Sequence, residues 1–252
     1  MPAPRDDRPV VLFDWGETLM WIPGMIHDPD RHLACVEEIY DERIRPHVRG
    51  ASGGAPVGRF VEHYLLACRR QIAQSKATQR EHSFADRFAM AFALAGVDAL
   101  PPRAVFEGIA DALGDAVARN ARLLDGAADV VPRLAATHRL GVVSNYPHGP
   151  VVAASLARFG LLRHFEAVVV SSETGWMKPH ADCYRPALAA LAADPARTLM
   201  VGDDLVNDVR GAKALGLHTA WLAPHATALD AAVDIHLRHL DELPAHCARL
   251  FA

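Results

Sequence analysis

Residues 10–19 read Val10-Val11-Leu12-Phe13-Asp14-Trp15-Gly16-Glu17-Thr18-Leu19. The four large apolar residues from Val10 to Phe13 predict a strand that is buried on both faces, as in a parallel sheet. Asp14 then lies at the carboxyl end of that strand, where open α/β sheets bind their ligands. A buried carboxylate is costly unless a metal, a cation or hydrogen bonds compensate its charge. Taken alone, the pattern also fits an Asp that caps the following turn.

The composition is that of an ordinary globular protein. The chain has 252 residues, of which 51% are hydrophobic and 22% charged, and a net charge of −4. It therefore offers no basic footprint for nucleic acid or a membrane surface. No apolar stretch approaches the ~18 residues of a membrane span, and the polar residues 1–8 contain no apolar signal core. The four cysteines are far apart, which is typical of the reduced thiols of a cytoplasmic protein: Cys35, Cys68, Cys183 and Cys247.

Residues 20–123 contain no convincing strand and several helical stripes. Breaks at 50–54 and 100–102 separate the stripes. The apolar residues that recur at helical spacing are Leu33, Val36, Ile39 and Tyr40, then Phe60, Val61, Tyr64, Leu65 and Cys68, then Phe84, Phe88, Phe92 and Leu94, and finally Val105, Ile109 and Leu113. We expect these side chains to form the core of a helix bundle.

The second half of the chain alternates strands with helices. The expected strands are 140–145, 165–171, 198–204 and 219–222, with 232–235 as a last edge strand. This alternation predicts an α/β fold with a doubly wound parallel sheet and right-handed crossovers. We therefore expect an α/β core of residues 1–19 and 124–252 and an inserted helical cap of residues 20–123.

Each of four successive predicted strands is followed by a polar group of a different kind. These groups are Asp14, Ser144-Asn145, Lys178, and Asp203-Asp204 with Asp208 one helical turn further on. The carboxyl ends of parallel strands lie side by side, so we expect the groups to converge on one crevice. One carboxylate can act as a nucleophile, and the others can hold Mg²⁺ through oxygen ligands. A hydroxyl and a lysine can hold an anionic group against that nucleophile.

This set of residues resembles the haloacid dehalogenase-like (HAD) hydrolase superfamily over nearly the whole chain. Four motifs occur in the order of the family: residues 13–19, Val143-Ser144-Asn145, Lys178-Pro179, and Gly202-Asp203-Asp204 through Asn207-Asp208. Residues 211–216 also continue as the family usually does. The helical insertion resembles the C1 cap of the family, a lid that closes over the site.

The resemblance implies a role for each motif residue. Asp14 would attack phosphorus and form an aspartyl-phosphate, Ser144 would bind a phosphoryl oxygen, and Lys178 would steady the nucleophile and the substrate charge. The Mg²⁺ ligands would be Asp14, the backbone carbonyl of Gly16 and Asp203, with help from Asp208 or Asp204. The expected substrate contacts are Ser144, Asn145, Lys178 and Trp15.

The sequence departs from the family at Gly16, where most of its phosphatases carry a second Asp as general acid and base. Such help is typically worth roughly 10²–10⁴-fold in rate. A cap residue could replace it (the candidates are His27, Asp28, Asp30 and His32), whereas we expect Glu17 to point away. A second interpretation is the dehalogenase reaction at carbon, because halide leaves without a proton. A third is a non-catalytic binding protein.

We favour a Mg²⁺-dependent phosphatase that acts on a small phosphorylated metabolite. We expect it to be cytoplasmic, to act as a monomer or homodimer, and to bind neither nucleic acid nor a membrane. Substrate identity is expected to reside in the cap and in loop residues such as Trp15, Trp21, Tyr146 and His148.

Overall fold

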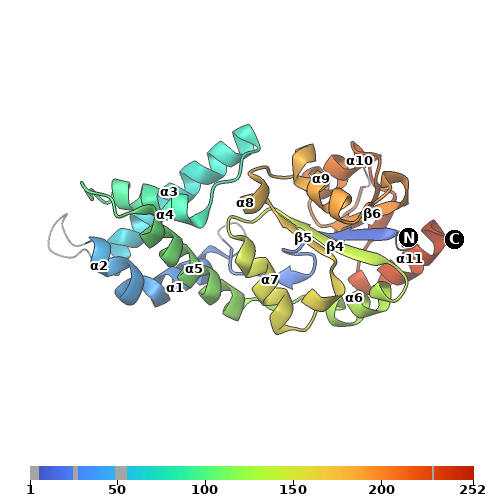
Figure 1. The fold of residues 1–252 in the computed structure, drawn as a ribbon, viewed down its shortest axis with the longest axis horizontal. Helices are drawn as coiled ribbons and strands as arrows, with labels where there is room; N and C mark the ends of the chain where they lie inside the picture. The colour runs from blue at the N-terminus through green and yellow to red at the C-terminus, as the bar shows by residue number, and fades with distance from the viewer. Residues whose placement is uncertain (1–5, 25–27, 49–55, 229) are drawn as a thin grey trace, which may run out of the picture.

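A computed structural model describes residues 6–24, 28–48, 56–228 and 230–252. At its centre lies a six-stranded parallel sheet with the strand order β5-β4-β1-β6-β7-β8 (Figure 1). The strands are β1 (Val10–Phe13), β4 (Arg139–Ser144), β5 (Ala167–Val170), β6 (Thr198–Gly202), β7 (His218–Leu222) and β8 (Ile235–Leu237). The predicted α/β fold is confirmed, although the edge strand begins at Ile235 instead of residue 232.

Strand β1 lies in the middle of the sheet, between β4 and β6. Val11 pairs with Leu140 on one side and with Leu199 on the other. Because neighbouring strands cover its edges and helices cover its faces, Val11, Leu12 and Phe13 expose no surface. The unbroken apolar run is thus explained by burial on both faces.

Helices cover both faces of the sheet, with α9 and α10 on one side and α6 and α11 on the other (Figure 1). Leu12 packs in the same apolar cluster as Tyr184 of α9, whereas Phe13 belongs to the cluster of the opposite face. The flanking elements are α6 (Ala127–Ala135), α7 (Gly149–Arg158), α8 (Ser171–Thr174), α9 (Ala181–Ala190), α10 (Gly211–Lys213), α11 (Leu243–Leu250) and the short turns η2 (Leu162–His164), η3 (Pro195–Arg197), η4 (Leu205–Arg210) and η5 (Leu240–Glu242).

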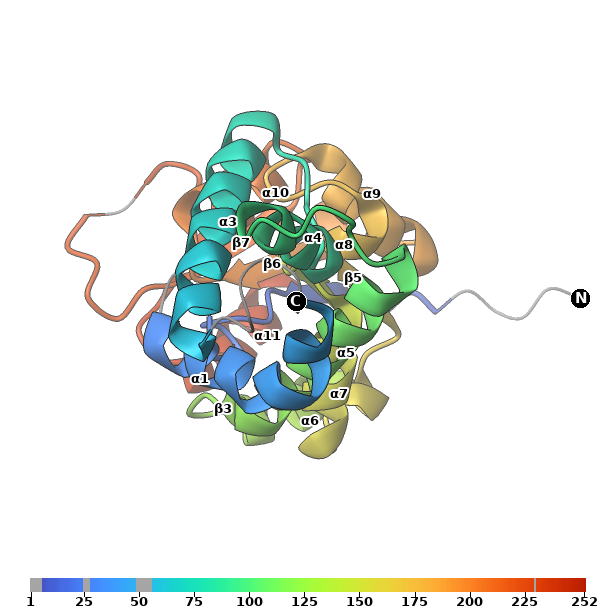
Figure 2. The ribbon, with the colours of Figure 1, turned by 90° about the vertical axis from the view of Figure 1, so that its left-hand side faces the viewer.

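A second group of helices lies beyond the carboxyl ends of the strands (Figures 1 and 2). It consists of α1 (Pro29–Ile39), η1 (Tyr40–Ile44), α2 (Arg45–Val48), α3 (Val57–Thr78), α4 (Phe84–Leu94) and α5 (Arg103–Asn120). The predicted stripes do form its core, since Phe60, Phe88 and Phe92 are fully buried. The predicted break at 50–54 lies outside the described residues.

Two very short strands connect this helical group to the sheet domain. Met20–Trp21 (β2) pairs antiparallel with Arg122–Leu123 (β3). The expectation of no strand between residues 20 and 123 is therefore wrong at its two ends. Strands of two residues carry no detectable alternation, which is why the sequence pattern does not reveal them. The boundaries of the cap stay a prediction, and the β2–β3 pair lies on them.

A further contact, which we call the clasp, joins residues 79–81 to residues 175–177. The Glu81 N–H donates to the Gly175 carbonyl at 3.2 Å, and the Met177 N–H donates to the Gln79 carbonyl at 2.9 Å. The Trp176 ring lies between the Arg80 guanidinium, 3.3 Å from its centroid, and the His180 ring, 3.7 Å away and nearly parallel. The clasp thus combines backbone bonds with a cation–π contact.

None of the described helices is long and apolar enough to cross a membrane. The four cysteines are buried and form no disulfide, as the reduced thiols predicted from the sequence should be.

Candidate active site

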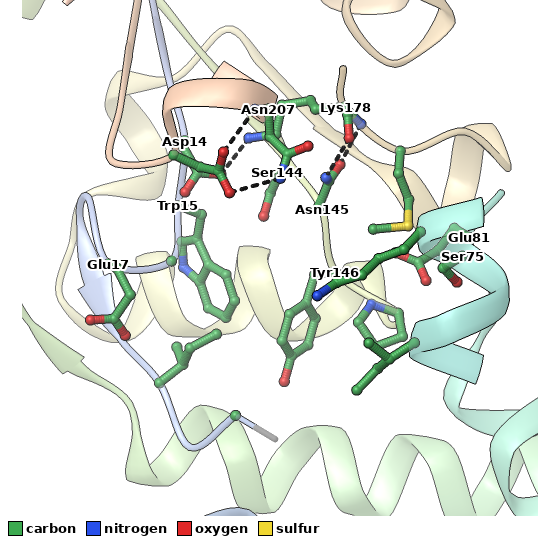
Figure 3. A pocket seen from close by; sticks show the side chains of 18 of the residues that line it. Asp14, Trp15, Glu17, Ser75, Glu81, Ser144, Asn145, Tyr146, Lys178 and Asn207 are labelled. Atoms are coloured by element: carbon green, nitrogen blue, oxygen red, sulfur yellow. Dashed lines mark hydrogen bonds and ion pairs between the residues drawn. The ribbon is translucent and has the colours of Figure 1, made fainter. Parts of the chain in front are cut away.

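Asp14 follows the central strand directly, and the residue is 8% exposed. Its N–H donates to the Val201 carbonyl of β6 at 2.8 Å, which continues the sheet pairing by one residue. Ser144 ends the neighbouring strand β4 and is buried. Figure 3 shows Asp14, Ser144, Asn145 and Lys178 gathered at one end of a pocket. The predicted convergence at the carboxyl edge of the sheet is therefore what the structure shows.

Lys178 places one ammonium group among three oxygen acceptors. Its Nζ donates to Asp14 Oδ1 at 2.6 Å and to the Val143 carbonyl at 2.7 Å, and it lies 2.7 Å from Asp208 Oδ1. Burial alone would lower the pKa of Lys178, but the two carboxylates hold that pKa well above its ordinary value. Lys178 is therefore a fixed positive charge beside Asp14.

Asn145 positions the loop that carries Lys178. Its Oδ1 accepts the Lys178 N–H at 2.7 Å, and its Nδ2 donates to the Lys178 carbonyl at 3.0 Å (Figure 3). Both ends of the amide are thus occupied by backbone. The predicted substrate contact of Asn145 stays a prediction, and its visible role is to hold the lysine in place.

Three carboxylates form an acidic cluster next to this lysine. Oxygen atoms of Asp14, Asp203 and Asp208 lie within 4.8 Å of one another. Burial and mutual repulsion raise the pKa of Asp203 to about 7, and they raise the pKa values of Asp14 and Asp208 as well. One lysine cannot balance three carboxylates, so the donor set fits a hard divalent cation such as Mg²⁺.

The adjacent residues Asp203 and Asp204 have different roles: Asp203 belongs to the acidic cluster, and Asp204 does not. Asp204 Oδ1 accepts the N–H groups of Val206 and Asn207 at 2.8 Å each, so Asp204 caps η4. Asp208 belongs to the acidic cluster instead. A Cβ on Gly202 would lie 2.2 Å from Asp208 Oδ2, so only glycine leaves room for that carboxylate. Of the two candidates for completing the metal site, the geometry favours Asp208.

A pocket of about 640 Å³ opens from this cluster toward the helical group. Figure 3 shows Asp14 and Lys178 at one end and Glu81 and Ser75 on the side of α3. The residues that line it include Asp14, Trp15, Gly16, Glu17, Ile22, His32, Gln71, Ile72, Ser75, Glu81, His82, Phe84, Arg87, Ser144, Asn145, Tyr146, Met177, Lys178, Asp203 and Asp208. Core and helical group thus build the pocket together.

The Trp15 indole lies within the protein core at the base of this pocket. It is fully buried, donates its Nε1–H to Ser155 Oγ at 3.1 Å, and meets the Tyr146 ring edge-on at 5.0 Å. Its predicted contact with substrate stays a prediction. Such a contact would be apolar, because the one polar atom of the side chain, Nε1, already donates to Ser155. Trp21 and His148 lie outside the residues that line the pocket.

None of the described residues that could replace the missing general acid at Gly16 presents a free acid group to the pocket. His27 lies outside the described residues. Asp28 caps α1 through the Arg31 N–H, and Asp30 is exposed. His32 lines the pocket, but both of its ring nitrogens are occupied, by the Pro23 carbonyl and the Tyr64 hydroxyl. Figure 3 shows the Glu17 carboxylate directed away from Asp14, as expected.

Glu81 and Arg87 are charged pocket residues that were not predicted from the sequence. Glu81 precedes α4, where its Oε2 accepts from Ser171 Oγ at 2.6 Å and its Oε1 from the His82 N–H at 2.9 Å. Burial raises the pKa of Glu81. Arg87 is part of α4 and is 6% exposed. Its position next to the stripe residue Phe88 is the only local signal of burial.

Comparisons with known proteins agree with this geometry. Residues 9–216 match the family model of the haloacid dehalogenase-like hydrolases. The chain is 36% identical over 102 residues to the glyceraldehyde 3-phosphate phosphatase of Pyrococcus abyssi, which covers 40% of this chain and 42% of that protein. It is 31% identical over 116 residues to the pyrimidine 5′-nucleotidase YjjG of Escherichia coli, with coverages of 46% and 51%. The chain thus matches about half the length of these curated relatives.

A solved structure provides the corresponding comparison of folds. The 2-haloacid dehalogenase from Pseudomonas syringae pv. tomato DC3000 has a TM-score of 0.72 and 22% identity, over 97% of this chain and 100% of that chain. At this identity the likeness shows the fold alone. The family model covers most of the sequence. The parallel sheet, the residues at its strand ends and the order of those residues agree with it, so the chain belongs to the haloacid dehalogenase-like hydrolases.

Proposed function

We propose that this protein is a Mg²⁺-dependent phosphatase of the C1-capped branch, acting on a small phosphorylated metabolite. The observation that carries the proposal is the buried Asp14 carboxylate, held 2.6 Å from the Lys178 ammonium at the end of a pocket. The phosphatase names among its relatives support it. The buried thiols and the acidic net charge agree with a cytoplasmic enzyme.

The reaction begins when an Asp14 oxygen forms a bond to phosphorus and the ester P–O bond breaks. The departing oxygen takes a proton from water, and the phosphoryl group remains on Asp14 as an acyl phosphate. Water then attacks phosphorus, which releases inorganic phosphate and regenerates the carboxylate. Lys178 and the Ser144 hydroxyl hold the phosphoryl oxygens throughout, in a site whose burial strengthens their electrostatic effect.

The metal ligands in this proposal are Asp14, the Gly16 carbonyl, Asp203 and Asp208. Magnesium supplies positive charge that balances the acidic cluster and the phosphoryl oxygens. Thr18 Oγ1 donates to Asp203 Oδ1 at 3.3 Å and so orients one ligand. The Asp204 N–H donates to Asp208 Oδ2 at 3.0 Å and orients another.

Gly16 determines which esters react fastest. With no carboxyl group at this position, protonation of the leaving oxygen lacks the help that is worth roughly 10²–10⁴-fold in rate. Esters of acidic hydroxyl groups, such as aryl and acyl phosphates, need little protonation. We expect them to be better substrates than simple alkyl phosphates.

The test is hydrolysis of p-nitrophenyl phosphate with Mg²⁺ or with EDTA, by the wild type and by Asp14→Asn. We expect turnover that requires Mg²⁺ and is abolished in the variant. Asp98→Asn, which changes an exposed carboxylate in the segment after α4, is the control and should react like the wild type. Absence of turnover in the wild type contradicts the proposal. Halide release from 2-haloacids would then identify the dehalogenase reaction.

A further inference from the structure

Arg87 is a buried cation without an ionic partner. It lines the pocket, is 6% exposed, and donates its Nε–H to Gln71 Oε1 at 2.9 Å. Among the residues that the structure describes, no carboxylate oxygen lies within 4.0 Å of its guanidinium. Lys178, the other buried cation that lines the pocket, has such partners in Asp14 and Asp208.

The groups around Arg87 do not balance its charge. The guanidinium carbon lies 5.0 Å from the Phe84 ring centroid and 6.0 Å from that of Tyr64. Its side-chain hydrogen-bond partners, the Gln71 amide and the Tyr64 hydroxyl, are neutral. Among the carboxylates of the pocket, Glu81 interacts electrostatically with Arg87, but it lies beyond ion-pair distance, and its oxygens accept from Ser171 and His82. A buried charge left in this state costs several kcal/mol unless an anion joins it.

A second polar group in the same wall also lacks a partner. The Tyr146 hydroxyl is buried and has no hydrogen-bond partner among the described residues. In Figure 3 the Tyr146 ring points its hydroxyl away from Asp14 and Ser144. A buried hydroxyl is normally satisfied, so this one is available to bond an atom of a ligand that enters the pocket.

The two groups are brought together by the junction of α4 with the loop after β4. The Phe84 N–H donates to the Pro147 carbonyl at 3.2 Å, and the Phe84 ring meets the Tyr146 ring edge-on at 5.7 Å. Arg87 is one turn further along the same helix. Helix α4 and the sheet domain thus form this part of the pocket jointly.

We propose that Arg87 and the Tyr146 hydroxyl form a second anion subsite, which binds a carboxylate or second phosphate on the substrate. The inference rests on the proposed function and deepens it. The phosphoryl group to be cleaved lies at Asp14, Ser144 and Lys178, and the other anionic group lies at Arg87. The substrate is then a phosphate ester with two anionic ends, small enough for a pocket of about 640 Å³.

Isothermal titration calorimetry tests the second anion subsite without requiring turnover. The ligands are 3-phosphoglycerate and glycerol 3-phosphate, which differ in having a carboxylate or a hydroxymethyl group at the far end. Both are titrated in the presence of Mg²⁺ into the Asp14→Asn protein, so that neither is consumed. A charge-assisted pair should give 3-phosphoglycerate an affinity about 10- to 100-fold higher. A third ligand, 1,3-propanediol bisphosphate, shows whether the subsite prefers a second phosphate to a carboxylate.

Variants then show which residues cause the preference for 3-phosphoglycerate over glycerol 3-phosphate. On the Asp14→Asn background, Arg87→Met should bring the ratio of the two affinities close to 1, and Arg87→Lys should restore part of it. Tyr146→Phe removes a hydroxyl that has no partner among the described residues, so the variant should fold normally and lower the ratio about 3- to 10-fold. Arg69→Met, which removes an exposed charge from α3, is the matched control and should keep the wild-type ratio.

Each outcome decides the inference. A ratio near 1 in the parent protein, no binding of any of the three ligands, or a ratio that survives both Arg87→Met and Tyr146→Phe overturns it. The binding affinities are measured independently of whether the wild type hydrolyses p-nitrophenyl phosphate. A protein that binds two-ended anions through Arg87 but hydrolyses no phosphate ester therefore refutes the proposed function and leaves the subsite established.

Discussion

At the scale of single residues, Lys178 contributes both to the site and to stability. It is the ammonium shared by Asp14, Asp208 and the Val143 carbonyl. Removing one partner of a buried ion pair leaves the other charge uncompensated. Lys178 therefore both orients Asp14, the proposed nucleophile, and compensates the buried carboxylates at the carboxyl edge of the sheet.

The first prediction follows from that contact. Lys178→Met should abolish hydrolysis of p-nitrophenyl phosphate and lower the free energy of unfolding by about 3–5 kcal/mol in EDTA. Urea unfolding measures the second effect. Lys213→Met is the control, because the Lys213–Asp234 pair is solvent-accessible and should contribute less than about 1 kcal/mol. Equal losses in the two variants would contradict the assigned role.

A second prediction concerns His32. Burial, and then the charge of Arg87, lower the pKa of His32 to about 3, so it stays neutral in the folded protein. In the unfolded chain it binds a proton below its ordinary pKa of about 6.5. Its contribution to stability is therefore complete above pH 6.5 and is lost as the pH falls from 6.5 toward 3.

The expected size of this loss is about 2 kcal/mol between pH 7 and pH 5. Urea unfolding of the wild type and of His32→Gln at both values measures it. The variant should be less stable at pH 7, since its contacts with Pro23 and Tyr64 are lost, but its stability should change less with pH. A parallel decline in the two proteins would show that His32 is protonated in the fold.

At the scale of elements, the clasp fixes the helical group against the site. It consists of backbone pairing between residues 79–81 and 175–177 and of the ring contacts of Trp176. Residue 178 follows the clasp directly and carries the ammonium group of the site. Movement of α3 and α4 away from the sheet must therefore break this contact.

The third prediction is that Trp176→Ala raises KM more than it lowers kcat. The stacked contacts hold the helical group next to the pocket, and the substitution leaves Asp14 and Lys178 unchanged. Hydrogen exchange should become faster at the amides of Glu81 and Met177, which donate across the clasp. Phe159→Ala, a half-buried aromatic residue away from the pocket, is the control. Unchanged exchange at both amides would refute the clasp.

The elements also show how far the sequence alone could lead. The polar residues at the strand ends were predictable, because an apolar run that is followed directly by a carboxylate is typical of a buried strand that ends at a site. The position of Asp14 at the end of β1 agrees with that prediction. Arg87 was not, since an arginine on an amphipathic helix is usually exposed, and only the packing of α4 on Gln71 and Tyr64 buries it. The division of labour between Asp204 and Asp208 also depends on the path of η4, which no spacing rule fixes.

At the scale of the whole molecule, Mg²⁺ should stabilise the fold. The acidic cluster exists only in the folded chain, so a cation that binds there shifts the unfolding equilibrium toward the native state. At a Mg²⁺ concentration ten times its Kd, the gain is about 1.4 kcal/mol. For a chain of this size that corresponds to a rise in Tm of about 3–5 °C.

Differential scanning calorimetry in Mg²⁺ and in EDTA measures this fourth prediction. Asp203→Asn should remove most of the difference between the two conditions. Asp30→Asn should keep it, because Asp30 is exposed in α1. An equal response of both variants to Mg²⁺ would place the cation elsewhere.

The β2–β3 pair has a consequence for protein engineering. Met20 lies opposite Leu123 and Trp21 opposite Arg122, so the chain leaves the sheet domain and returns to it at neighbouring points. A segment with adjacent ends can be exchanged as a cassette without altering the course of the remaining chain. We expect that a tight turn joining residues 21 and 122 leaves a sheet domain that still folds, and that foreign helical segments can be grafted there to give new substrate preferences.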